Sequence, residues 1–165
     1  MNSKTNKQAV NQQTNAQPEN KASDKPILSA KVILTSGVAM LLSPGSTTTV
    51  GYEIGHEPEQ DELLIRLTGS SGGGLCSKEW FGLAQVVVLL NEQQPDKAFT
   101  SGLFKVIWNF KGSSNNAGFL AAVLRHLELT KAAPDVRFGH LITGKHTEWF
   151  DSLKAKLPEA TNAAQ

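Results

Sequence analysis

The hydrophobic pattern of this 165-residue chain changes once, at the glycine-rich segment GSSGGG, residues 69–74. Before that segment, apolar and polar residues alternate, as they do in half-buried strands. After it, apolar residues recur mainly at helical spacing. A run of strands followed by helices is typical of an α+β fold. We therefore predict an antiparallel β-meander of about four to six strands packed against about three helices.

The first strands are expected before the glycine-rich segment. Residues 27–42 read as two strands interrupted by Gly37, and alternation predicts further strands over residues 47–54 and 62–68. The segment Ser43-Pro44-Gly45-Ser46 separates them as a turn, because proline fixes φ and glycine permits positive φ.

Three helices are expected after residue 74. The first begins at Ser77, whose hydroxyl can cap it, and ends near residue 91. A second spans residues 117–129 and a third residues 147–157. The second has an apolar stripe of Leu120, Val123, Leu124 and Leu127. Between the helices, residues 103–110 (LFKVIWNF) and 136–142 are predicted as strands.

The chain ends differ in composition from the rest. Residues 1–24 hold only two aliphatic side chains larger than alanine, Met1 and Val10. Such a segment cannot bury enough apolar surface to offset the entropy of ordering it. We predict disordered tails at residues 1–25 and 158–165, and a single domain over residues 26–157.

The sequence carries no targeting or membrane signal. No apolar run of signal-peptide length follows the N-terminal lysines. The longest apolar stretch, residues 86–90, is far below the roughly 20 residues that span a bilayer. The one cysteine, Cys76, cannot form an internal disulfide. These features predict a cytoplasmic protein that is not bound to a membrane.

Charge is distributed unevenly along the chain, although the whole sequence is near neutral at +1. Residues 26–96 hold three basic and eight acidic side chains, a net charge of −5. Residues 97–157 hold nine basic and four acidic ones, a net charge of +5. This asymmetry points to a polyanionic partner or to head-to-tail association, unless the fold intermixes the two halves.

The loop KGSSNN, residues 111–116, is the first candidate binding site. It lies directly before a predicted helix, whose free N–H groups and dipole favour anions. Its polar side chains are hydrogen-bond donors without an acidic neighbour. The alternative is an ordinary capped helix, with Ser114 or Asn115 as the N-cap.

The preceding segment adds a second feature. Its predicted strand carries Lys105 and Trp108, and exposed aromatic and basic side chains bind single strands by stacking and charge neutralisation. The alternative places Trp108 inside, with Phe104 and Phe110. With two further cations, the predicted nucleic-acid site comprises Lys105, Trp108, Lys111, Ser113, Ser114, Asn115, Asn116, Arg125 and Lys145.

Other chemistries lack their sequence signatures. The histidines have no HExxH spacing and no nearby cysteine, so we expect no metal site. His140 and His146 flank Thr143-Gly144-Lys145 and are expected to face solvent in a loop. The GSSGGG segment has neither the spacing of a dinucleotide fingerprint nor a following Lys-Ser or Lys-Thr, and we expect no cofactor. No GxSxG elbow is present.

One short segment carries a resemblance. Residues 73–83, GGLCSKEWFGL, follow strands through a glycine turn into a predicted helix opened by a Ser-x-Glu-Trp phrase. This arrangement resembles a family of transcriptional coactivators that bind single-stranded DNA as dimers. The present strands are acidic where that family's strands are basic.

The sequence thus predicts a non-enzymatic accessory protein that binds nucleic acid, single-stranded DNA in particular, through its basic C-terminal half. The alternative is a protein–protein interaction or self-assembly module whose acidic and basic faces pair. A third interpretation is a small enzyme acting on a phosphorylated ligand at residues 111–116, although no catalytic constellation supports it.

Overall fold

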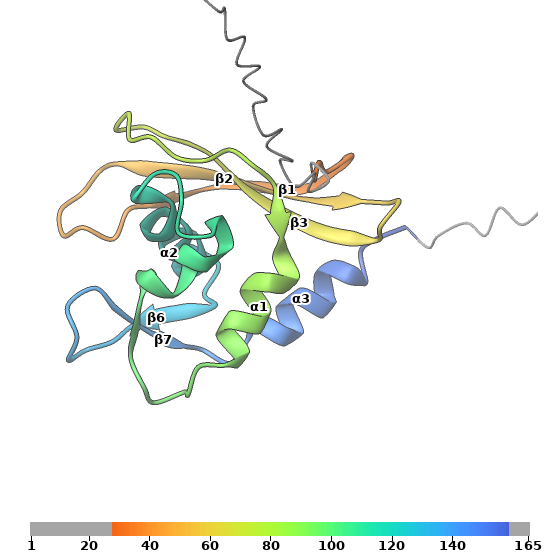
Figure 1. The fold of residues 1–165 in the computed structure, drawn as a ribbon. Helices are drawn as coiled ribbons and strands as arrows, with labels where there is room; N and C mark the ends of the chain where they lie inside the picture. The colour runs from red at the N-terminus through yellow and green to blue at the C-terminus, as the bar shows by residue number, and fades with distance from the viewer. Residues whose placement is uncertain (1–27, 159–165) are drawn as a thin grey trace, which may run out of the picture.

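A computed structural model describes residues 28–158 of the chain (Figure 1). The described part has the predicted α+β architecture, with two antiparallel sheets, three α-helices and one 3₁₀ helix. Apart from Pro158, both predicted tails lie outside the described residues. No helix between residues 28 and 158 is both long enough and apolar enough to cross a membrane.

The larger sheet is a meander in which neighbouring strands follow one another in the chain. Its strands are β1 (Val32–Met40), β2 (Thr49–Glu57), β3 (Glu62–Ser70) and β4 (Phe81–Gly82). Gly37 lies in the middle of β1. Residues 32–40 therefore form one strand and not two strands interrupted at Gly37, as was predicted from the sequence. It lies opposite Tyr52, and a Cβ at Gly37 would be only 2.5 Å from the tyrosine Oη. The glycine therefore makes room for a buried ring.

One face of this sheet carries the core, as the alternation predicted. Tyr52 and Ile54 of β2 are buried there together with Ile65 and Leu67 of β3. Helix α2 (Asn115–His126) lies against this face, and Figure 1 shows it beneath β2. Three members of its predicted stripe are fully buried, namely Leu120, Val123 and Leu124.

The helix boundaries differ from the predicted ones. Helix α1 (Leu83–Asn91) begins six residues after Ser77, because Phe81 first pairs with β3 and is buried. The Ser-x-Glu-Trp phrase therefore does not open a helix. Helix α2 starts at Asn115 and ends before residue 129, since Glu128 adopts a positive φ of 58°. Helix α3 spans His146–Lys154.

The largest correction concerns residues 103–110, which do not form a strand. Residues Ser101–Trp108 form the 3₁₀ helix η1. Phe104 is fully buried, whereas Val106 is 43% exposed and Phe110 is 75% exposed, so the predicted common face does not exist. The residues of this segment that pack in or against the core are Leu103, Phe104, Ile107 and Trp108, which is a helical and not an alternating spacing. The sequence pattern fits both structures, and packing selects the helix.

A smaller sheet of three strands was only partly predicted. Its strands, in the order β5-β7-β6, are β5 (Phe99–Thr100), β7 (Gly139–Ile142) and β6 (Thr130–Ala132). Only β7 falls within a predicted strand, residues 136–142. Nearby, α3 lies beside α1 (Figure 1). His146 Nε2 of α3 is 2.8 Å from Asn91 Oδ1 of α1. This sheet borders the second cavity described below.

Candidate functional site

A hollow of about 180 Å³ lies at the N-terminal end of α2. Its lining comes from the end of η1, the following loop and the first turn of α2. Six of the nine predicted site residues line it, namely Lys105, Trp108, Lys111, Ser113, Ser114 and Asn116. The remaining lining residues are Phe110, Gly112 and Ala117.

The backbone after η1 shapes this hollow. Asn109 and Phe110 both adopt left-handed conformations, with φ of 50° and 58°, and Gly112 has a φ of 81°. Positive φ is uncommon for residues other than glycine and reverses the chain sharply. The backbone N–H of Phe110 donates to the carbonyl of Lys105 over 2.9 Å, which closes the turn. Phe110 therefore points outwards while Lys105 and Lys111 border the same hollow.

Two predicted donors hold a neighbouring segment in place. Ser113 Oγ donates to the carbonyl oxygen of Leu75 over 2.6 Å, and Asn115 Nδ2 donates to the same oxygen over 3.1 Å. Asn116 Oδ1 accepts a hydrogen bond from the backbone N–H of Ser77, 2.8 Å away. These bonds fix residues 75–77 against the start of α2. No side-chain cap is formed by Ser114, the N-cap residue.

Two buried donors at the hollow have no hydrogen-bond partner among the described residues. They are Trp108 Nε1 and Asn116 Nδ2. Asn116 is only 2% exposed, and its orientation is fixed because its oxygen already accepts from Ser77. A buried unpaired donor costs about 1–3 kcal/mol, so such groups call for an explanation. Both residues line the hollow.

The electrostatics of the hollow favour an anion. Lys105 and Lys111 are exposed, and neither forms an ion pair with another described residue. The first turn of α2 contains no acidic residue. Its N-terminal dipole therefore adds to the lysine charges without competition.

Trp108 is half-buried. Its ring meets that of Phe81 edge to face, with centroids 5.1 Å apart, and it packs against the core. The exposed aromatic at the hollow is Phe110, which was expected to lie inside. The sequence contained a signal for this, since Phe110 lies between Asn109, a residue type that tolerates left-handed backbone, and the Lys111-Gly112 pair.

The other two predicted cations lie away from the hollow. Arg125 is near the opposite end of α2, where its Nη2 donates to the carbonyl of Gly139 over 2.8 Å. Burial lowers the pKa of its guanidinium from the ordinary value. Lys145 pairs with Glu128, with 3.4 Å between Nζ and Oε2. The predicted cluster therefore contracts to the residues around η1 and the start of α2.

The two histidines that flank residues 143–145 have different surroundings from those expected. His140 and His146 are buried, at 1% and 5% exposed, rather than facing solvent. Burial raises the pKa of the Cys76 thiol, which disfavours the reactive thiolate. In residues 28–158, no three His, Cys, Asp or Glu side chains are placed to hold a metal ion.

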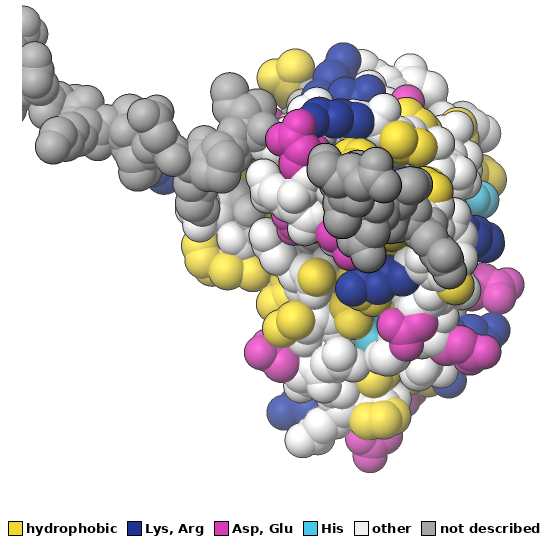
Figure 2. Space-filling model, turned by 90° about the vertical axis from the view of Figure 1, so that its right-hand side faces the viewer, with side chains coloured by type: hydrophobic (Ala, Val, Ile, Leu, Met, Phe, Trp, Pro, Cys, Tyr) yellow, Lys and Arg dark blue, Asp and Glu magenta, His cyan; other side chains and the backbone are white. Residues whose placement is uncertain are grey.

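The fold brings acidic and basic side chains together on one side of the molecule. On the face shown in Figure 2, Lys and Arg side chains are interspersed with Asp and Glu. The separation of acidic and basic residues along the sequence therefore does not produce a patch of uniform charge on that face.

Comparison with known proteins finds no matching family model, no similar curated protein and no similar solved structure.

Proposed function

We propose that this protein is a non-enzymatic accessory protein that binds single-stranded nucleic acid at the hollow. A backbone phosphate would lie at the start of α2, between Lys105 and Lys111. The observation that carries this proposal is that Trp108 Nε1 and Asn116 Nδ2 are buried without a partner among residues 28–158, and that the two lysines of the hollow form no ion pair with those residues. Phosphate oxygens supply both the negative charge and the acceptors that this arrangement lacks.

A strand is favoured over an isolated phosphate compound by the neighbouring aromatic side chain. Phe110 lines the hollow and is 75% exposed, a large exposure for a phenylalanine. A base attached to the bound phosphate could stack on its ring, which requires unpaired bases. Single-stranded nucleic acid provides such bases, whereas those of a duplex are already stacked.

The test is a fluorescence-anisotropy titration of a labelled oligothymidine with the full chain at several salt concentrations. Each neutralised phosphate of a single strand contributes about −0.7 to the slope of log affinity against log salt. Replacing both lysines (Lys105→Gln with Lys111→Gln) should weaken binding and flatten the slope by about 1.4. Phe110→Ala should cost about 1–3 kcal/mol of binding and leave the slope nearly unchanged.

A matched control separates site chemistry from net charge. Lys97 and Lys131 are also exposed, and neither lines the hollow. Replacing both with glutamine changes the net charge equally and should leave most of the slope intact. Equal losses in the two double variants would refute the hollow as the binding site. Absence of binding by the wild-type chain at low salt would refute the nucleic-acid function itself.

A second function, self-association, is favoured by one specific observation. Strand β1 is an edge of the larger sheet and carries exposed apolar side chains. Their exposed fractions are 42% for Val32, 48% for Ile33, 58% for Val38 and 59% for Met40. An edge of this kind can accept a strand from another chain. Sedimentation of the same samples would reveal an oligomer if this function replaces nucleic-acid binding.

A further inference from the structure

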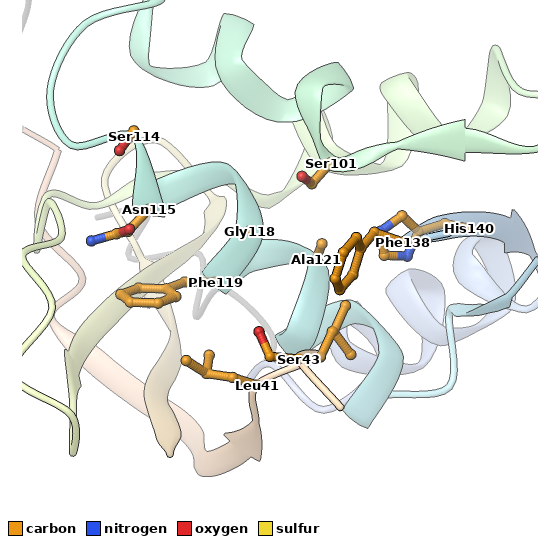
Figure 3. A pocket seen from close by; sticks show the side chains of 11 residues that line it. Leu41, Ser43, Ser101, Ser114, Asn115, Gly118, Phe119, Ala121, Phe138 and His140 are labelled. Atoms are coloured by element: carbon orange, nitrogen blue, oxygen red, sulfur yellow. The ribbon is translucent and has the colours of Figure 1, made fainter. Parts of the chain in front are cut away.

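A second cavity, of about 330 Å³, lies along the first turns of α2 (Figure 3). Helix α2 lines it from Ser114 to Ala121. Residues 41–43, from the turn after β1, border it, as do Ser101, Phe138 and His140. This groove has a volume within the range of small-molecule sites, about 300–1,000 Å³. It shares only Ser114 with the hollow described above.

The lining of the groove is uncharged. Leucine and phenylalanine side chains provide apolar surface, and serine, asparagine and histidine provide hydrogen-bonding groups. In Figure 3, the rings of Phe119 and Phe138 lie at opposite ends of the groove. A charged ligand would lose its hydration here without gaining a counter-charge from the lining. The lining therefore suits a neutral molecule with apolar faces and polar edges.

His140 supplies a polar group that the fold leaves unpaired. It is 1% exposed, and its Nδ1 is buried without a hydrogen-bond partner among the described residues. Burial, with the nearby Arg125 charge as a second cause, lowers the histidine pKa from 6.5 to about 4. The ring is therefore neutral at physiological pH and carries one donor and one acceptor nitrogen.

Gly118 keeps the groove open at a cost to the helix. A glycine inside a helix destabilises it by about 1 kcal/mol relative to alanine. Packing does not require glycine here, because a Cβ at Gly118 would meet no described atom within 4 Å apart from its chain neighbours and the backbone of its own helix. The open space that it faces is the groove, which Gly118 lines.

Phe138 is held in an unfavourable backbone conformation beside His140. Its φ is 56°, and its side chain is 48% exposed. Left-handed backbone at a bulky residue is strained, and such strain is concentrated at ligand sites. Here the strained residue places an aromatic ring at the edge of the groove.

We propose that this groove is a second binding site, for a neutral planar heteroaromatic ring of the nucleobase class, with His140 bonded to the polar edge of the ring. The apolar lining would contact the faces of the ring. The ring could belong to a free nucleoside or to a base of a bound strand, since Ser114 lines both cavities. The site goes beyond the proposed function and does not depend on it.

The test is an NMR titration of the ¹⁵N-labelled full chain with adenosine. Saturable shifts are expected for the backbone amides of Gly118, Phe119 and residues 139–141. Gly118→Leu fills the groove with a side chain and should weaken adenosine binding about tenfold or more. Gly118→Ala is the control for the helix, because it raises helix propensity while adding only a methyl group. Thermal unfolding verifies that both variants are folded.

The results of the adenosine titration can be distinguished from those of the oligonucleotide titration that tests the hollow. The Lys105→Gln, Lys111→Gln double variant should bind adenosine like the wild type. Reduced oligonucleotide affinity in Gly118→Leu would identify a strand base as the ligand, and unchanged affinity a free nucleoside. Absence of saturable shifts at millimolar adenosine, or equal binding by Gly118→Leu, would overturn the proposed groove site, whatever the result of the oligonucleotide titration.

Discussion

Replacing Phe104 with alanine is expected to lower the free energy of unfolding by about 3–5 kcal/mol. The phenylalanine is fully buried, and its ring meets that of Phe99 edge to face with centroids 6.1 Å apart. Removal of the ring loses this burial and leaves a cavity that the surrounding core cannot fill completely. Urea unfolding of the full chain, followed by circular dichroism, measures the change.

Val106→Ala is the matched comparison on the same 3₁₀ helix. Val106 is 43% exposed, so its truncation should cost no more than about 0.5 kcal/mol. In the strand predicted from the sequence, Phe104 and Val106 would share one face and lose comparable burial. Large losses at both positions would therefore contradict the helical assignment of η1.

Acidification is expected to destabilise the fold through His140. Because its pKa falls to about 4 on folding, the unfolded chain binds a proton that the folded chain does not, once the pH drops below about 6.5. Stability should decline from pH 6.5 to pH 4, by up to about 3 kcal/mol from this group. Burial also lowers the pKa of His146, which acts in the same direction. Above pH 6.5 this contribution to the pH dependence vanishes.

A substitution separates the effect of His140 on stability from that of the carboxylates, which titrate in part of the same pH range. His140→Leu should lose about 3 kcal/mol less stability between pH 7 and pH 4 than the wild type. The exposed His126, changed to leucine in the same way, should leave the wild-type decline in place. If His140→Leu and wild type declined equally in urea unfolding, His140 would not be held neutral by burial.

The parts of the fold that follow from sequence are those with long, regular patterns. Strand β2 alternates from Thr49 to Ile54, β3 contains the apolar run Leu63–Ile65, and α2 has a continuous apolar stripe. Strands β5 and β6, with two and three residues, are too short to show a period. Segment 101–108 alternates like a strand but is helical, and the aromatic partner of its Trp108 is Phe81, which is distant in the sequence.

The hollow could be predicted from the sequence because its lining residues lie close together in the chain. The Lys, Ser and Asn residues of positions 111–116 directly precede a helix. They therefore lie at its N-terminal end whatever the rest of the fold does. The positions of Arg125 and Lys145 depend on tertiary packing, which links them to Gly139 and Glu128. The groove was missed because its lining comes from four separate parts of the chain.

The most direct test of the central claim observes the two unpartnered donors themselves. The ¹⁵N-labelled chain is titrated with an oligothymidine at low salt, and the Trp108 indole N–H signal is assigned with Trp108→Phe. A phosphate in the hollow predicts saturable shifts of this indole N–H and of the Asn116 side-chain NH₂. Both should follow the affinity measured by anisotropy. Binding that leaves these two signals unmoved while amides elsewhere shift would contradict the account.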